Sequence, residues 1–306
     1  MMYSVVGMLA LLFLVHFIGY GERVGAKSWI YLGFGSIQPS EVAKLIIIVY
    51  FSSVFAKKYE AGTIDNLNQS IAPPIGILVL VIGSIMMETD IGTSLIIIII
   101  ALSVMAASGI KTKTFMKLSG LISVFLLFLA TYLFFNWDTI MTDGRKGRIL
   151  SFMNPFDYDL TSGYQVVNGY IAIGAGGVKG LGLGNSVQKM GYLPEPHTDV
   201  IMAIISEELG IIGAIIVIGG LGFIVLRALT IALKAKDPHA RMLAAGIGSM
   251  IGIQAFVNIG GLTGLIPLTG VPLPLISYGG TSVILTSIAI GILMNVSMFV
   301  KIENNK

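Results

Sequence analysis

Ionisable side chains that could do chemistry gather in one stretch, GYLPEPHTDVIMAIISEELG. Glu195, His197 and Asp199 alternate along it, and Glu207 and Glu208 follow inside an otherwise apolar run. Because a charged group is costly when it faces lipid, at least one of the two glutamates should face the protein interior or a cavity. The alternating residues could also ligate a metal, although such a site needs further ligands from elsewhere in the chain. His197 alone fits a structural hydrogen bond better than a metal site.

The position of Asp199, between a loop and an apolar helix, leaves two roles open for its carboxylate. Asp199, or Thr198 before it, could cap the helix by accepting hydrogen bonds from first-turn N–H groups. Asp199 could instead be a general base, since partial burial makes a carboxylate a better proton acceptor. Nearby cations and the helix dipole oppose that effect, so the residue pattern does not decide between the two roles.

Basic residues precede this stretch in two groups. The segment DGRKGRI contains Arg145, Lys146 and Arg148. It suits either a solvated loop beside anionic headgroups or a clamp for a phosphate-bearing ligand, whose oxygens arginine grips in a bidentate fork. The glycine run GAGGVKGLGLGNS holds Lys179, and Lys189 follows it. The run favours tight turns, or backbone N–H groups that face a bound anion. It lacks the ending of a nucleotide-binding loop, so we expect no nucleotide.

Polar residues also mark the ends of other predicted helices. In QPSEVAK, Glu41 and Lys44 lie three positions apart on one helix face and can pair. In ETDIGTS, Asp90 precedes a helix start and is a candidate N-cap. The uncharged segment GLIPLTGVPLPLISYGGTS either walls a groove for an apolar tail or plugs the helix bundle, because non-helical backbone at membrane depth must be buried or line a cavity.

The chain that carries these residues has the composition of a membrane protein. Hydrophobic residues make up 55% of its 306 residues and charged residues 11%, against roughly 25% charged in soluble domains. Apolar runs of about 18 to 20 residues span a bilayer. We therefore predict an all-α polytopic membrane protein with about eight transmembrane helices, rather than a barrel of alternating segments. The predicted spans are 3–20, 40–56, 71–87, 91–108, 115–135, 200–227, 241–264 and 281–300.

The same composition bounds topology and partners. Lys and Arg concentrate in one set of connections, which the positive-inside rule assigns to the cytoplasm together with both termini. The opposite face carries one large extracytoplasmic loop, 136–198, in which 164–173 should form a short helix or a re-entrant segment. The chain 1–306 is predicted to be a single integral membrane domain. It has no cysteine for thiol chemistry and no basic-aromatic patch for nucleic acid.

Three blocks together resemble one protein family. GAKSWIYLGFGSIQPSEVAKL, GYLPEPHTDVIMAIISEELG and PLPLISYGGTS resemble the signature blocks of the SEDS family, named for shape, elongation, division and sporulation. The blocks occur in the family's order from Gly25 to Ser282, which is more specific than any single motif. The segments LPEPHTD and SEELG are more similar to the sequences of the members that serve cell division than to those that serve elongation.

The resemblance implies a peptidoglycan glycosyltransferase at the outer face of the cytoplasmic membrane. Such enzymes polymerise lipid II, an undecaprenyl-pyrophosphate-linked disaccharide peptide. The family's aspartate in the HTD block, here Asp199, is the candidate catalytic residue. The resemblance also implies a class B penicillin-binding transpeptidase and other divisome membrane proteins as partners, the division septum as location, and a divalent cation, Mg or Mn, as cofactor.

The candidate residues form two sets. Candidate substrate-binding residues are Arg145, Lys146, Arg148, Gln165, Lys179, Lys189, Glu195, His197, Ser277 and Tyr278. Acids expected to have a structural or functional role are Glu41, Asp90, Glu207 and Glu208. The metal ligands cannot be assigned from the sequence.

Two departures from the family pattern stand out. Members have ten spans and the GAKSW block follows their third, whereas here it follows the first, so two N-terminal helices are expected to be missing. ETDIGT replaces the usual QPDLGT, which puts Glu88 where a glutamine is usual.

Two rival functions predict different patterns. A lipid II flippase needs polar groups along the middle of several spans, whereas the acids here cluster at span ends. A non-catalytic scaffold for a transpeptidase would not need Asp199.

Overall fold

A computed structural model describes residues 2–20, 28–31, 33, 35–88, 90–135 and 143–304. A helix lies at each of the eight predicted spans, with ends within a few residues of the predicted ones except at α9, which runs seven residues further. These helices are α1 (Met2–Ile18), α2 (Pro39–Glu60), α3 (Ala72–Met87), α4 (Ile91–Ala107), α5 (Thr112–Phe135), α9 (Ile201–Lys234), α10 (Pro238–Leu262) and α11 (Gly280–Asn304). The prediction of a mostly helical chain is confirmed.

Length and composition make several of these helices membrane spans. Within the described residues, five helical segments are long and apolar enough to cross a bilayer: Pro39–Glu60, Leu67–Met87, Ile201–Lys234, Pro238–Leu262 and Gly280–Glu303. The helices α1 and α4 are apolar but shorter. The chain is therefore a multi-pass membrane protein, whereas the number of eight spans stays a prediction.

The chain divides into two compact units. Unit 1 comprises 1–119, 223–253 and 280–306, and unit 2 comprises 120–222 and 254–279. The single domain predicted from the sequence stays a prediction.

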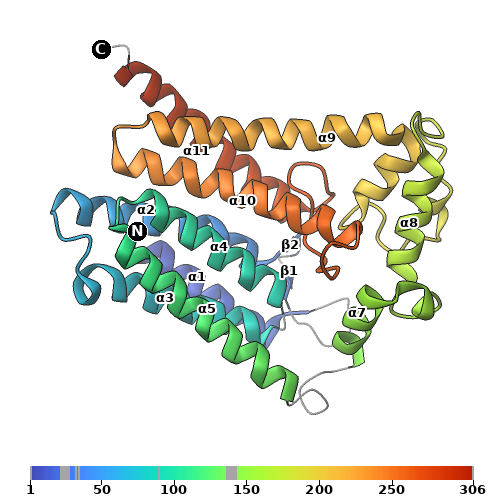
Figure 1. The fold of residues 1–306 in the computed structure, drawn as a ribbon, viewed down its shortest axis with the longest axis horizontal. Coiled ribbons are helices and arrows are strands. Elements are labelled where there is room, and N and C mark those ends of the chain that lie inside the picture. The colour runs from blue at the N-terminus through green and yellow to red at the C-terminus, as the bar shows by residue number, and fades with distance from the viewer. Residues whose placement is uncertain are drawn as a thin grey trace. The chain divides into compact units, whose positions relative to one another are not determined.

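Unit 1 is organised around α2. This helix packs against α1, α3, α4 and α11, and Figure 1 shows α1 to α4 as one bundle. Small residues let helices approach closely: a Cβ atom on Gly246 would lie 2.7 Å from Val104 and 2.8 Å from Ile48. A two-stranded antiparallel sheet, β1 (Ile30–Tyr31) with β2 (Ser36–Ile37), adds a small element that the all-α prediction lacked.

Unit 2 contains the described part of the predicted outer loop, which is folded. It forms α7 (Asp143–Met153), a 3₁₀ turn η2 (Pro155–Tyr158), α8 (Tyr164–Gly176) and a second turn η3 (Gln188–Met190). Figure 1 shows α7 and α8 in yellow-green. The short helix expected at 164–173 is confirmed and extends to Gly176. Residues 136–142 of the loop lie outside the described residues.

Candidate functional site

The glycine run wraps the first turns of α9. The backbone N–H groups of Leu181 and Gly182 donate to the carbonyl oxygens of Glu207 and Glu208, each over 2.9 Å. Such bonds demand close backbone approach, and a Cβ atom on Gly180 would lie 2.1 Å from the Glu208 carbonyl oxygen. The prediction of tight turns and close approach is confirmed.

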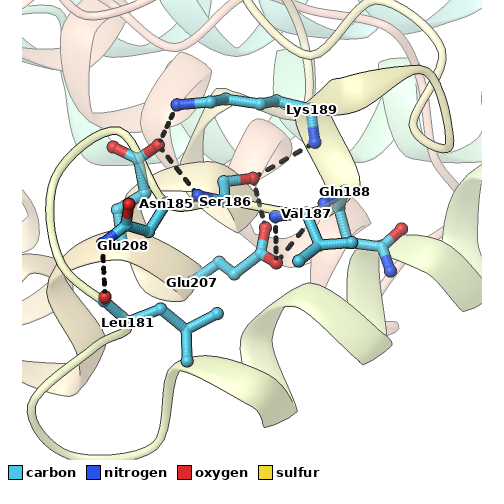
Figure 2. A network of polar contacts seen from close by, with 8 residues as sticks. All are labelled: Leu181, Asn185, Ser186, Val187, Gln188, Lys189, Glu207 and Glu208. Atoms are coloured by element: carbon cyan, nitrogen blue, oxygen red, sulfur yellow. Dashed lines mark hydrogen bonds and ion pairs between the residues drawn. The ribbon is translucent and has the colours of Figure 1, made fainter.

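The buried carboxylate of Glu207 accepts hydrogen bonds from the end of this loop. Glu207 is 1% exposed. It accepts hydrogen bonds from the Ser186 hydroxyl and from the backbone N–H of Val187 at 3.0 Å and of Gln188 at 3.4 Å (Figure 2). The sequence left open whether the N–H groups of the glycine run, with Lys179, face a bound anion. In the structure the N–H of Ser186, at the end of the run, faces the carboxylate of Glu208, and the next two N–H groups face that of Glu207. The expectation that one of the two glutamates faces the interior is confirmed.

Glu208 takes a different partner on the same loop. Its carboxylate accepts from the Lys189 ammonium at 2.5 Å and from the Ser186 backbone N–H at 3.4 Å (Figure 2). Lys189, a candidate substrate-binding cation from the sequence, thus lies in an ion pair that ties η3 to α9. Together the two glutamates hold the loop that leads to Asp199.

Asp199 lies two residues before the start of α9 at Ile201 and is 3% exposed. Its carboxylate accepts a hydrogen bond from the Gln165 amide of α8 at 3.3 Å and another from the Thr198 hydroxyl at 3.1 Å. The same Thr198 hydroxyl lies 3.1 Å from a carboxylate oxygen of Glu195. The structure therefore brings Gln165, a residue chosen from the sequence, directly to the predicted catalytic carboxylate.

The last outer loop and α10 fix the backbone around Asp199. The Ser277 hydroxyl donates to the Thr198 carbonyl oxygen at 2.6 Å, and the Tyr278 backbone N–H donates to the His197 carbonyl oxygen at 2.7 Å. The Asn258 side-chain amide donates to the carbonyl oxygen of Asp199 at 2.7 Å. Sequence reasoning selected Ser277 and Tyr278 but missed Asn258, whose signal was an amide within an apolar helix.

The remaining candidates are charged residues of the outer loop, most of them with exposed side chains. The side chains of Glu195, His197, Arg148 and Lys179 are exposed, and Lys146 is half-buried. The side chain of Arg145 lies outside what the structure describes. The roles of these cations toward a substrate stay predictions.

The two remaining acids belong to unit 1 and have structural partners. Glu41 and Lys44 form an ion pair of 2.6 Å, with side chains 5% and 1% exposed. The carboxylate of Asp90 accepts from the Thr93 N–H at 2.9 Å and caps α4. Both predictions, the pair and the cap, are confirmed.

Glu88 lies just beyond the end of α3 and is 3% exposed. Neither of its carboxylate oxygens has a hydrogen-bond partner among the described residues. Burial, and secondarily the charge of Asp90, raises the pKa of Glu88 to about 8. At neutral pH this carboxyl group is therefore largely protonated and, like a glutamine side chain, uncharged.

The described residues offer no cage for a metal. None of their His, Asp and Glu side chains form a group of three or more that could hold a metal ion. The Gln165 amide and the Thr198 hydroxyl act as hydrogen-bond donors to the Asp199 carboxylate, as they would not to a cation. The divalent cation, Mg or Mn, stays a prediction.

This fold and this junction define a multi-pass membrane protein with a buried carboxylate at the end of a folded loop. A family model described as "Cell cycle protein", covering FtsW, RodA and SpoVE, matches residues 1–302. The chain belongs to this FtsW/RodA/SpoVE family, and the resemblance found in its sequence is confirmed.

Curated relatives agree with the family match. The chain is 47% identical over 300 residues to the probable peptidoglycan glycosyltransferase FtsW of Bacillus subtilis, covering 98% of this chain and 74% of that protein. It is 39% identical to the FtsW of Geobacter metallireducens (96% and 76% covered) and 40% identical to the stage V sporulation protein E of Bacillus subtilis (94% and 76% covered).

Solved structures share the fold. A chain of a peptidoglycan synthase complex, described as coordinating polymerization and crosslinking, superposes with a TM-score of 0.76 at 25% identity, covering 97% of this chain and 80% of that one. The rod shape determining protein RodA of Thermus thermophilus superposes with a TM-score of 0.64 at 24% identity, covering 97% and 77%.

Proposed function

We propose that the chain is a peptidoglycan glycosyltransferase that polymerises lipid II, and that Asp199 is its general base. The observation that carries the assignment of the base is the burial of Asp199 between Gln165 and Thr198, at the end of the folded loop. The family match and the names of the relatives support the reaction class.

The reaction requires one proton acceptor near the growing bond. The acceptor sugar's hydroxyl oxygen forms a bond to the anomeric carbon of the donor. The bond from that carbon to the pyrophosphate oxygen breaks, and undecaprenyl pyrophosphate leaves with the bonding electrons. Asp199 takes the hydroxyl proton, which makes the oxygen a better nucleophile as the bond forms.

The hydrogen bonds at Asp199 determine how an acceptor could reach it. Because the carboxylate is buried and bonded to Gln165 and Thr198, the acceptor hydroxyl replaces one of these donors as it approaches. Three backbone restraints, from Asn258, Ser277 and Tyr278, hold residues 197–199 in place meanwhile. Such positioning contributes to the rate by keeping the reacting groups aligned.

Cations of the outer loop would offset the charge of the leaving pyrophosphate. Arg148 and Lys179 have exposed side chains that can meet a phosphate group. Lys189 serves instead to pair with Glu208. The divalent cation implied by the family remains part of this proposal, without assigned ligands.

The proposal includes location and partners. Both termini lie in the cytoplasm and the loop 136–198 lies outside, as the distribution of Lys and Arg predicts. The relatives named FtsW support work at the division septum with other divisome proteins. The synthase complex that shares the fold supports a transpeptidase partner, which we take to be a class B penicillin-binding protein.

Polymerisation of labelled lipid II by the purified protein with its transpeptidase partner tests the proposal. Asp199→Asn should abolish glycan strands while its melting temperature stays near that of the wild type. Asp159→Asn, at an exposed acid of the same loop, is the matched control and should keep activity. Undiminished polymer from Asp199→Asn would exclude this base. Transport of lipid II by a wild-type protein that makes no polymer would favour the flippase, and recruitment of the transpeptidase alone would favour the scaffold.

A further inference from the structure

A cavity lies between the C-terminal parts of α9 and α11. On α9, Arg227, Thr230 and Lys234 recur at intervals of three and four residues and share one helix face. On α11, Ser297 and Lys301 share a face in the same way. These five residues line a cavity of about 260 Å³, which we name the α9–α11 basic pocket.

Charge and polarity in this pocket favour an anion. Its lining includes three cationic side chains and two hydroxyls, and no acid among the described residues. Arginine can grip a phosphate with two parallel N–H donors, and lysine adds a point charge. The Thr230 hydroxyl already donates to the Arg227 carbonyl oxygen at 2.8 Å, so Ser297 is the lining hydroxyl that can supply a further donor to a phosphate oxygen. A water molecule takes about 30 Å³ in the liquid, so the cavity has room for a phosphate group and part of what it is attached to.

The surroundings of the pocket are apolar and exposed. Leu226 is 64% exposed, Leu233 86% and Phe299 58%, and they flank the pocket residues along α9 and α11. Ile231 and Val300 supply apolar contacts within the lining. A ligand that places an anionic group in the pocket therefore meets hydrocarbon next to it, which is the chemistry of a phospholipid rather than of a free anion.

Two simpler explanations of the cations account for only part of the pattern. Cations in the last turn of a helix offset its dipole, which fits Lys234 and Lys301. Arg227 lies about two turns before the end of α9, so the dipole does not explain it. The second explanation is the excess of Lys and Arg on the cytoplasmic side of membrane proteins. It does not explain why cations from two helices that are distant in sequence line the same cavity.

We propose that the α9–α11 basic pocket binds the phosphate of an anionic phospholipid in the adjacent leaflet, with its acyl chains along the exposed apolar side chains of α9 and α11. Basic pockets between transmembrane helices are suited to lipid headgroups. The site is separate from the proposed glycosyl transfer, and its test needs no enzymatic readout.

The test uses the full chain in detergent, with phosphatidylglycerol as the probe and phosphatidylcholine as the neutral comparison. Native mass spectrometry should show retention of phosphatidylglycerol by the wild type over phosphatidylcholine. The pair Arg227→Gln with Lys301→Gln should weaken that retention at least about tenfold, since it removes two charge-assisted hydrogen bonds to the phosphate. Lys57→Gln with Lys236→Gln is the control, because both lysines are exposed and outside the pocket lining.

Every other outcome contradicts the proposal. Equal retention of both lipids by the wild type, or unchanged selectivity in Arg227→Gln with Lys301→Gln, would remove the pocket as a lipid site. Inorganic phosphate that displaces phosphatidylglycerol at equal concentration would show a free-anion site instead. A hexaglutamate peptide that binds through the two residues while phosphatidylglycerol does not would assign the pocket to an acidic protein segment. If the double variant does not fold, Arg227→Lys alone gives the same comparison, since it keeps the charge and removes the bidentate fork.

Discussion

The side-chain amide of Asn258 donates to the backbone oxygen of Asp199 over 2.7 Å, although 59 residues separate them in the chain. A second donation from the same amide nitrogen reaches the Val271 carbonyl oxygen, also at 2.7 Å. One buried amide in α10 thus joins the start of α9 to the last outer loop. The proposed base is thus held through its backbone as well as through the hydrogen bonds of its carboxylate.

Replacement of Asn258 should therefore loosen the backbone at Asp199. In Asn258→Asp, a carboxylate would face two carbonyl oxygens that now accept hydrogen bonds. Leaving two buried acceptors unpaired costs on the order of 1–3 kcal/mol each, so we expect a lower melting temperature and reduced polymerisation of lipid II. Gln165→Asn is a useful comparison, since it affects the carboxylate of Asp199 and leaves its backbone restraint intact. A variant Asn258→Asp with wild-type stability and activity would show that this amide holds nothing essential.

The fold could be predicted because it depends on local patterns. Apolar runs located all eight helices, and the spacing of Glu41 and Lys44 and the position of Asp90 before α4 predicted their partners within four residues. These interactions act along one helix, where sequence separation determines which side chains meet. The family resemblance added Asp199, which the pattern alone had left between cap and base.

The partners of the site could not be predicted because they come from distant segments. Glu207 meets Ser186 across a loop of glycines, and Asn258 meets Asp199 from another helix. No periodicity in the sequence encodes these pairings; they depend on how the loop folds over α9. Lys189 is an example: the sequence suggested that it binds the substrate, whereas in the structure it forms an ion pair with Glu208.

The buried carboxylate of Glu207 makes a second prediction. In Glu207→Gln, one acceptor oxygen becomes an NH₂ group, which then faces either the Ser186 hydroxyl or the N–H groups of Val187 and Gln188. Loss of these bonds at a buried site should destabilise the protein by about 1–3 kcal/mol and loosen the loop 177–191. Thermal unfolding and limited proteolysis measure the two effects. The exposed acid Glu195 provides the control, since Glu195→Gln should change neither. An equally protease-resistant loop in Glu207→Gln would refute this role.

Two glycines of α8 give a matched pair. A Cβ atom on Gly176 would lie 1.8 Å from the Ser206 carbonyl oxygen, whereas a Cβ atom on Gly174 would meet nothing within 4 Å. We expect Gly176→Ala to destabilise the protein strongly, because the contact is with backbone that cannot rotate away. Gly174→Ala should be neutral or stabilising by up to about 1 kcal/mol, as expected for Ala in a helix. The melting temperatures of the two variants measure this difference. Equal values would mean that α8 and α9 do not pack as closely as described.

Glu88 predicts a dependence of stability on pH. Because its pKa is raised to about 8 in the folded protein, the folded state binds a proton that the unfolded state loses above about pH 4.5. Stability should therefore be greatest near and below pH 4.5 as far as this group is concerned, and should fall as the pH rises toward 8. The slope is at most about 1.4 kcal/mol per pH unit from one group.

Glu88→Gln isolates this contribution. The variant should be more stable than the wild type above pH 8 and should lose the part of the pH slope that Glu88 causes, as measured by melting temperature between pH 5 and 9. Glu60→Gln, at an exposed acid, should leave the slope unchanged. Identical slopes in the wild type and Glu88→Gln would show that Glu88 is ionised and solvated in the folded protein.

The buried pair Glu41–Lys44 predicts strong non-additivity. Removal of one partner leaves a charge with 1% or 5% exposure and no counter-ion, which costs about 3–5 kcal/mol. Lys44→Met and Glu41→Gln should each lower the melting temperature by a large amount. The double variant should be much closer to the wild type, because desolvation of the two charges offsets most of their attraction. A double-mutant cycle of thermal unfolding measures the coupling between the two sites. Additive losses would mean that the two side chains act separately, each through its own contacts in α2.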